Sequence, residues 1–351
     1  MAGNTVTTHV TEIVLPGKVE PEGLRVTRRE LPAPGAGQVV LTLAATGVSF
    51  AEQQMRRGKY FDQPPFPFVP GYDVVGTVTA TGPGVDTGLI GRRFAAVTKV
   101  GGWAGALLLD AADLVAVPDG VPAAAAETVV VNGVTAWQML HRTAGVRSGG
   151  TIVVLGANGG VGSTLVQLAR HHGVTVIGTA SPRHHAVVRD LGAVPVDYRD
   201  PQMYRRIREL APDGVDAVFD HVGGAGVVES WRLLRRGGTL VSYGTAATKD
   251  TDGNSRLPVL KLFARLALWN YLPNGKSAHF YNFWAGKRHL DTFRSRLRED
   301  LTQVLELVAD GVLVPQIAAE FPLSEASAAL ALAESRTVAG KVVLVPDADR
   351  A

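Results

Sequence analysis

Cysteine is absent from this chain of 351 residues. Its absence excludes disulfides, thiolate nucleophiles, iron–sulfur clusters and every zinc site that needs a cysteine ligand. The sequence also lacks an apolar signal core at its N-terminus, and it has no uninterrupted apolar stretch of membrane-spanning length. We therefore expect a cytoplasmic protein without an integral membrane segment.

Charge of one sign is not concentrated anywhere in the sequence. The formal net charge is +3, and the arginine pairs are dispersed along the chain. Because there is no contiguous basic element, we expect no nucleic-acid partner. The length is sufficient for two domains, each with a core of its own.

The most informative stretch is 151–170, which reads TIVVLGANGGVGSTLVQLAR. Its first part is a mostly β-branched apolar run, typical of a buried parallel strand, and its second part has the apolar spacing of a helix. Gly156, Gly159 and Gly162 lie in between. Glycines at this spacing allow a pyrophosphate to approach the backbone, and the start of the helix receives the phosphates. The stretch predicts a dinucleotide site, although a glycine-rich turn in some other α/β protein remains the alternative.

Two kinds of pattern divide the chain. Residues 13–91 form short stretches broken by Pro and Gly, which indicates a β-rich, barrel-like domain. After residue 151, strands alternate with helices, which indicates a doubly wound parallel sheet. The expected elements include strands at 38–44, 74–80, 174–178, 194–196, 217–220, 239–242, 279–284 and 341–345, and helices at 123–140, 183–191, 204–210, 227–234, 257–272 and 297–309.

The residues after the second strand of the parallel sheet bear on the choice of dinucleotide. An acidic residue there would accept hydrogen bonds from the ribose of NAD and would repel a 2′-phosphate. This sequence has no Asp or Glu between Gly178 and His184. Ser181 offers a hydroxyl, and Arg183 offers a guanidinium that can pair with a phosphate. The cofactor predicted from these residues is NADPH, with a solvated Arg183 as the alternative.

Several short motifs together resemble the medium-chain dehydrogenase/reductase superfamily, and most of all its zinc-independent quinone oxidoreductase-like branch. They are GVSFAE at 47–52, VPGYDVVG at 69–76, NGVTAW at 132–137, GANGGVG at 156–162, LGA at 191–193, SYG at 242–244 and GKVV at 340–343. The resemblance implies an α/β fold with a GroES-like, β-rich catalytic domain and a Rossmann domain. It places the catalytic domain at 1–135, completed by 286–351, and the NADP-binding domain at 136–285. It also implies a homodimer.

The resemblance implies chemistry without a metal. Zinc-dependent relatives have a cysteine and a histidine ligand where this sequence has Ser49 and Tyr72. Alcohol oxidation needs a Lewis acid, so it is not expected here. Reduction of a quinone or of an activated C=C needs only hydride and an acid or hydrogen-bond donors for the oxyanion.

Three residues are the catalytic candidates. Tyr60 is similar to a tyrosine that acts as an acid in related enoyl reductases, and a phenol holds its proton at neutral pH; packing against neighbouring side chains is the alternative. Ser49 stands where many relatives have Asn and offers a hydroxyl to a substrate carbonyl. His221 follows a strand whose C-terminal end lines the cofactor crevice, so it is a candidate acid or base or else a structural histidine.

The resemblance and the glycine pattern supply the expected cofactor-binding residues. At the position of the lysine that often holds the 2′-phosphate in relatives, this chain has His184, next to Arg183. Lys341 matches a C-terminal lysine that approaches the nicotinamide, with an ordinary strand-edge lysine as the alternative. The full set is Asn132, Thr135, Gly156, Asn158, Gly159, Gly160, Val161, Gly162, Ser181, Arg183, His184, Tyr198, Val222, Tyr243, Gly244 and Lys341.

We therefore expect an NADPH-dependent, zinc-free reductase of a quinone or of the C=C of an α,β-unsaturated carbonyl compound. One alternative is an enoyl or tailoring reductase of a specialised biosynthetic pathway. Another is a nucleotide-binding protein with little turnover that acts at a membrane surface, because Lys261 and Arg265 lie four apart on the apolar stretch 257–272.

Overall fold

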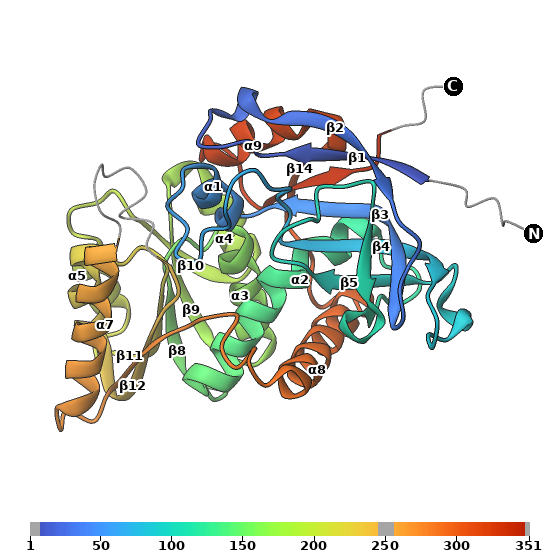
Figure 1. The fold of residues 1–351 in the computed structure, drawn as a ribbon. Coiled ribbons are helices and arrows are strands. Elements are labelled where there is room, and N and C mark those ends of the chain that lie inside the picture. The colour runs from blue at the N-terminus through green and yellow to red at the C-terminus, as the bar shows by residue number, and fades with distance from the viewer. Residues whose placement is uncertain (1–7, 245–255, 348–351) are drawn as a thin grey trace, which may run out of the picture. The chain divides into compact units, whose positions relative to one another are not determined.

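The computed structural model describes residues 8–244 and 256–347, and it divides into two compact units (Figure 1). Unit 1 contains the chain up to Val131, His289–Gly311 and the chain from Pro315 onward, and unit 2 contains Asn132–Arg288 and Val312–Val314. The division between Val131 and Asn132 lies inside helix α2 (Ala123–Trp137).

Unit 1 is built on a mainly antiparallel sheet of seven strands. Its strand order is β14-β15-β3-β4-β5-β7, with β6 paired to β3, and β1 and β2 form a separate antiparallel pair. The short strands and Pro/Gly turns of the sequence thus form the expected β-rich domain. The strands are β1 (Thr8–Val14), β2 (Arg25–Leu31), β3 (Gln38–Val48), β4 (Asp73–Thr81), β5 (Arg93–Val97), β6 (Ala106–Asp110), β7 (Val115–Ala116), β14 (Ile317–Pro322) and β15 (Lys341–Val345).

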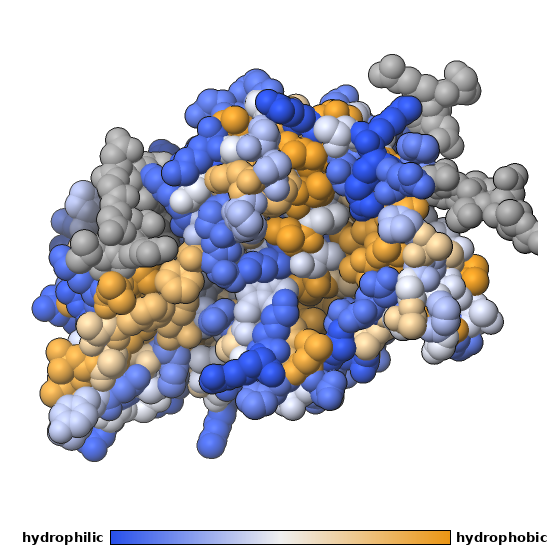
Figure 2. Space-filling view, viewed as in Figure 1, coloured by the Kyte–Doolittle hydropathy of each residue, from blue (hydrophilic) through white to orange (hydrophobic). Residues whose placement is uncertain are grey.

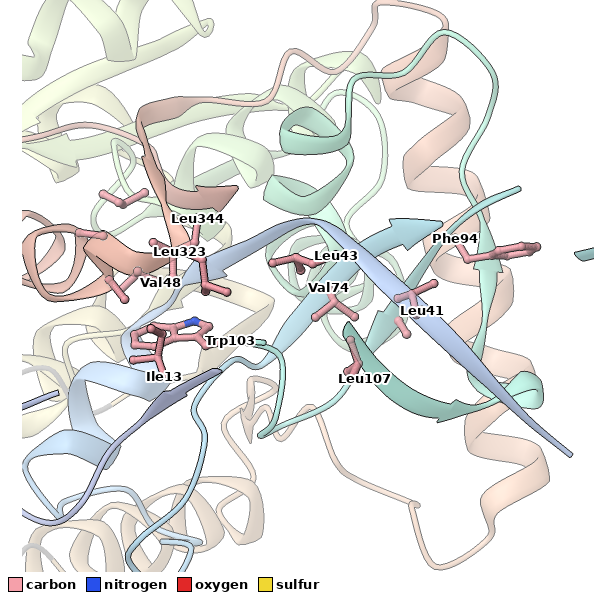
Figure 3. Close-up of a cluster of buried hydrophobic side chains, with 14 of the residues drawn as sticks. Ile13, Leu41, Leu43, Val48, Val74, Phe94, Trp103, Leu107, Leu323 and Leu344 are labelled. Carbon is pink, nitrogen blue, oxygen red and sulfur yellow. The ribbon is translucent and has the colours of Figure 1, made fainter. Parts of the chain in front are cut away.

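The core of unit 1 lies on one face of this sheet (Figure 3). Leu41 and Leu43 of β3 are both buried because alternate residues of a strand point to the same face. The indole of Trp103 is fully buried, and its Nε1–H donates to the carbonyl of Gly47 at 2.9 Å. That bond satisfies the one polar atom of the ring, so the largest core side chain carries no unpaired donor. The helices of this unit are α1 (Phe50–Arg56), α8 (Leu290–Ala309) and α9 (Ala326–Glu334).

Unit 2 is a parallel sheet of six strands in the order β10-β9-β8-β11-β12-β13. The chain runs outward from β8 through β9 to β10, and then from β11 through β12 to β13 on the other side. The order therefore reverses between β8 and β11, which is where ligands bind in doubly wound sheets. The strands are β8 (Thr151–Val154), β9 (Thr175–Ala180), β10 (Ala193–Asp197), β11 (Val215–Asp220), β12 (Leu234–Ser242) and β13 (Ser277–Phe280), and the helices are α3 (Gly160–His171), α4 (His185–Asp190), α5 (Met203–Leu210), α6 (Val227–Arg232) and α7 (Arg256–Tyr271).

Some element bounds differ from the sequence prediction. The strand expected at 279–284 is confirmed only at its start: β13 ends at Phe280, and the predicted continuation to 284 is wrong. The side chain of Asn282 accepts from the amide of Trp284 at 3.0 Å, which makes a turn. The helix expected at 227–234 ends at Arg232, because Leu234 already pairs with Val215 as the start of β12. The helix α2 continues as a π-helix over Gln138–Ala144.

Helix α7 presents an apolar surface. Leu260, Leu268 and Tyr271 are 63%, 55% and 87% exposed, and hydrophobic side chains gather over this helix in Figure 2. Its other side is packed, since Leu262 and Leu266 are buried in the core of unit 2. Within the described residues, no helix is both long and apolar enough to cross a membrane.

Candidate cofactor and catalytic sites

The glycine turn of unit 2 joins β8 to α3. Gly156 has φ of +70°, and its carbonyl accepts from the amide of Gly159 at 3.1 Å. A Cβ at Gly162 would lie 2.2 Å from the carbonyl oxygen of Gly156, so no side chain fits there. The turn is also held by Thr179 of β9, whose hydroxyl accepts from the Gly156 amide at 3.0 Å. Sequence reasoning did not single out Thr179, because its contact joins two strands.

The start of α3 is open to an anion. The N-cap Gly159 has no side chain to satisfy the first amides of the helix, and first-turn amides have no acceptor within the helix. Asn158, Gly160 and Val161 around it are half-buried. Free amides together with the helix dipole suit a pyrophosphate.

Helix α2 contributes two predicted residues beside this turn. Asn132 is 8% exposed, and a Cβ at Gly160 would lie 2.4 Å from its Nδ2. The amide of Asn132 thus packs directly on the first residue of α3. Thr135 lies one turn further along α2 and is also buried. The structure brings Asn132 to the glycine turn, and the contact of both residues with a cofactor stays a prediction.

His221 lies at the reversal of strand order. A Cβ at Gly156 would lie 2.5 Å from its Cε1, so the imidazole packs against the first glycine of the turn. Its Nδ1 is 3.0 Å from the carbonyl of Leu155. Because a carbonyl only accepts, Nδ1 carries the proton and Nε2 is an acceptor. Burial lowers the pKa of His221 in spite of the nearby Asp220 carboxylate, which favours the neutral ring.

Asp220 holds the turn that contains His221 and Val222. One carboxylate oxygen accepts from the amides of Val222 and Gly223 at 2.8 Å each, and the other accepts from Ser230 at 2.8 Å. From the sequence, Asp220 was predicted only to end a strand. Its burial and its hydrogen bonds to the turn amides and to Ser230 are visible only in three dimensions.

Tyr243 and Gly244 reach the same place from β12. The Tyr243 ring centroid is 6.0 Å from that of His221, and the Tyr243 amide donates to the carbonyl of Asp220 at 3.0 Å. A Cβ at Gly244 would lie 2.6 Å from the carbonyl oxygen of His221. The carboxyl ends of β8, β11 and β12 thus bring together predicted residues from three separate motifs.

A second group of predicted residues gathers at the end of β9. Arg183 is exposed, and its Nε lies 3.4 Å from the hydroxyl of the buried Ser181. Tyr198 is beside them, because its amide donates to the carbonyl of Ala180 at 3.3 Å. The turn from Ser181 to His185 has no carboxylate.

His184 differs from its neighbours in this group. It is 8% exposed, and its Nε2 is buried without a hydrogen-bond partner. Burial, aided by the positive charge of Arg183, lowers the pKa of His184 and favours the neutral ring. Of the two residues, Arg183 is therefore the one that can reach an anion in solvent. Arg199, which sequence reasoning missed, adds a second guanidinium 5.4 Å from the ring centroid of Tyr198.

In unit 1, Ser49 caps helix α1. Its hydroxyl accepts from the amide of Ala51 at 3.0 Å and donates to the carboxyl of Glu52, whose Oε2 also accepts from the Ser49 amide at 2.8 Å. This is a capping box. Burial raises the pKa of Glu52, although the Ser49 hydroxyl opposes the rise. A contact of Ser49 with substrate stays a prediction, because the structure uses both sides of its hydroxyl within the cap.

Tyr60 lies in the loop that follows α1 and is paired with a second tyrosine. Its hydroxyl is 2.9 Å from the hydroxyl of Tyr72, and the two rings meet edge to face with centroids 6.5 Å apart. Tyr72 is 5% exposed, whereas Tyr60 is half-buried. In the parts of the chain that the structure describes, no group of three or more His, Asp or Glu side chains could hold a metal ion.

Lys341 is buried inside unit 1. Its Nζ lies 2.9 Å from Asp73 Oδ2 and 2.6 Å from Glu127 Oε1. A Cβ at Gly47 would lie 2.2 Å from its Cε, so the glycine of the 47–52 motif makes room for this side chain. The surface strand-edge alternative is wrong, because Lys341 is 4% exposed. Its approach to a nicotinamide stays a prediction.

Comparison with known proteins identifies the family. The alcohol dehydrogenase GroES-like domain family matches residues 35–140, and the zinc-binding dehydrogenase family matches residues 191–344. The rat synaptic vesicle membrane protein VAT-1 homolog is 30% identical over 325 residues, which are 91% of this chain and 79% of the relative. The chain belongs to the medium-chain dehydrogenase/reductase superfamily.

Within this superfamily the chain is in the quinone oxidoreductase-like branch. A 2-haloacrylate reductase from Burkholderia is 31% identical over 90% of this chain and 93% of the relative. Two mycobacterial structures, one of a quinone oxidoreductase and one of a protein in complex with NADPH, are each 28% identical over 96% of this chain and 100% of theirs. Their TM-scores are 0.78 and 0.80. The predicted fold class is confirmed.

Proposed function

We propose that this protein is an NADPH-dependent reductase that passes hydride to a quinone or to the C=C of an α,β-unsaturated carbonyl compound. The observation that carries the proposal is the tight glycine turn, in which Gly162 has no room for a side chain, together with an exposed Arg183 after β9, the strand that pairs with β8. The mycobacterial NADPH complex and the haloacrylate reductase among its relatives support the cofactor and the reaction.

The residues of unit 2 fit NADPH. The open start of α3 would hold the pyrophosphate, and Ser181 and Arg183 would hold the 2′-phosphate, with Tyr198 beside them. Bound NADPH supplies the hydride. Neutral His221 would present its Nε2 as an acceptor beside the glycine turn, which suits a ribose hydroxyl or a proton relay.

Tyr60 is the proposed proton donor. Reduction of a C=C takes up one hydride and one proton, and a half-buried phenol that is already hydrogen-bonded is suited to give that proton. No metal ligand is required in this scheme, because the electron-poor substrate accepts hydride without a Lewis acid.

The test is the loss of NADPH absorbance with purified protein and a panel of acceptors. The panel contains benzoquinone, cyclohexenone, crotonyl N-acetylcysteamine thioester and a simple ketone, each also run with NADH. We expect turnover of the quinone or the enone with NADPH and none of the ketone. Preferred turnover of the thioester would instead favour the enoyl or tailoring reductase, and no turnover of any acceptor would refute the proposal.

We also propose that the protein is a cytoplasmic homodimer that buries the exposed face of α7. The exposed apolar side chains of Leu260, Leu268 and Tyr271 support the proposal that another surface covers this face. An anionic membrane is the competing occupant, because Lys261 and Arg265 are exposed on the same helix. Sedimentation analysis of wild type and Leu268→Glu, with co-sedimentation on phosphatidylserine vesicles, distinguishes them: dissociation of a dimer supports the first, and vesicle binding that the substitution removes supports the second.

A further inference from the structure

The hydrogen bond between Tyr60 and Tyr72 joins the proposed acid to a buried phenol that has no assigned role. We propose that Tyr72 is a positioning residue whose hydroxyl keeps its proton, donates a hydrogen bond to the Tyr60 oxygen and so stabilises the Tyr60 phenolate during substrate reduction. The inference rests on the proposed function, in which Tyr60 gives up a proton.

The backbone around Tyr72 is fixed from several directions. Its carbonyl accepts from the amides of Thr98 at 2.9 Å and Lys99 at 3.1 Å. The preceding Gly71 has φ of +106°, and a Cβ there would lie 2.4 Å from the backbone nitrogen of Trp103. The following residue, Asp73, is tied to Lys341. A phenol held in this way can orient a partner with little freedom of its own.

The direction of the hydrogen bond follows from the chemistry. Either hydroxyl of the pair could be the donor. A Tyr60 that gives its proton to substrate must point its own O–H at the substrate, so its oxygen accepts from Tyr72. In the proton transfer the Tyr60 O–H bond breaks, the substrate gains a C–H bond, and the bonding electron pair stays on the Tyr60 oxygen. Hydride comes from NADPH, and water afterwards returns a proton to Tyr60.

The Tyr72 bond is stronger after the transfer than before it. A hydrogen bond to an ionised acceptor is about twice as strong as one between neutral groups. Because the phenolate forms only as the proton leaves, this gain lowers the barrier and not the substrate affinity. The effect therefore falls on kcat, whereas a purely structural role of the Tyr72 ring would survive replacement by phenylalanine.

The experiment is a double-mutant cycle of Tyr60→Phe and Tyr72→Phe with cyclohexenone as the substrate. We expect Tyr72→Phe to lower kcat about 10- to 100-fold, as for one lost hydrogen bond to a charged group, with KM and the NADPH Kd unchanged. The double variant should be no slower than Tyr60→Phe alone, because Tyr72 acts through Tyr60. Tyr204→Phe, which removes a phenol that donates to the carbonyl of Gly226 at 3.2 Å, is the matched control and should keep wild-type kcat.

Each outcome separates the two proposals. A wild-type protein that reduces no acceptor of the panel overturns the proposed function and this inference with it, and one that reduces the quinone but no enone overturns the inference alone. Wild-type kcat in Tyr72→Phe, or independent losses that multiply in the double variant, overturn the inference alone. Thermal unfolding of wild type, the two single variants and the double variant provides a readout without substrate. If the losses of stability in the single variants do not add up in the double variant, the two hydroxyls are hydrogen-bonded to each other; additive losses contradict the pair.

Discussion

Replacement of Lys341 by methionine tests the buried cluster of unit 1. Lys341, Asp73 and Glu127 are each at most 4% exposed, and one ammonium faces two carboxyl groups. Methionine fills a similar volume without the charge. The variant therefore buries two carboxyl groups with no counter-cation. Removal of one partner from a buried ion pair costs about 3–5 kcal/mol, and that is the loss in unfolding free energy we expect near neutral pH.

The dependence on pH identifies the cause. Burial by itself would lower the pKa of Lys341, but the carboxylates of Asp73 and Glu127 outweigh it and raise the pKa. A lysine with a raised folded pKa contributes its full stability below its ordinary value and loses it only at higher pH, so this contribution is constant near neutrality. Burial raises the pKa of Glu127, and Lys341 opposes that rise. Without Lys341 the pKa rises further, and stability then falls as pH increases.

Urea unfolding of wild type and Lys341→Met, followed by tryptophan fluorescence, measures this difference. The free-energy gap should be larger at about pH 8 than at about pH 5.5, because acid protonates Glu127, whose pKa is raised, and removes its buried charge. A second variant with Glu127→Gln added should regain part of the loss. Exposed Lys18→Met is the control and should change stability by less than about 0.5 kcal/mol. A gap below about 1 kcal/mol, or one that is equal at both pH values, would refute the role of Lys341 as counter-cation.

Three further predictions concern function. Arg183→Ala should weaken NADPH binding by about 1.5–3 kcal/mol and leave NADH binding unchanged, whereas His184→Gln should change neither; titration of intrinsic fluorescence measures both, and equal losses for the two cofactors would make Arg183 structural. Tyr60→Phe should lower kcat for an enone by about 10²–10⁴-fold and for a quinone by less, since a reduced quinone can take protons from water; steady-state kinetics with a fall of less than about threefold on every acceptor would assign Tyr60 to packing. Activity should survive dialysis against a chelator, and elemental analysis that finds one tightly bound zinc per chain would contradict the metal-free scheme.

Local sequence patterns were sufficient to predict the strand, turn and helix of the expected cofactor site. The β-branched run of β8, the glycines and the start of α3 are adjacent in the sequence, so spacing alone predicted a strand, a tight turn and a helix. The parallel sheet followed from the alternation of strands and helices. Thr179 and Asp220 hold the turns of this site, and neither was predicted, because their partners come from other strands or from a later helix.

The burial and ion pairs of Lys341 could not be predicted from local sequence patterns. In the sequence it is a polar residue at the start of an apolar strand, which is the usual place for a solvated lysine. In the fold β15 pairs with β3, and this pairing places its side chain over Gly47 and against Asp73, which is 268 positions away. Gly47 was interpreted only as part of a family motif. The structure shows why a glycine is needed at this position: the side chain of Lys341 passes so close that a Cβ would not fit.

The same cluster connects to the pair of tyrosines through one peptide unit. Asp73 pairs with Lys341 and accepts from the amide of Val131 in α2, and Tyr72 is its neighbour in the chain. In a zinc-dependent relative this part of the sheet would supply a metal ligand. In this chain a buried phenol occupies that position, and the Asp73 carboxylate behind it is paired with Lys341 and hydrogen-bonded by a helix amide. If the Tyr72 proposal holds, a hydrogen-bond donor stands where such a relative has a metal ligand, and a donor is sufficient for reduction of an activated C=C but not for oxidation of an alcohol.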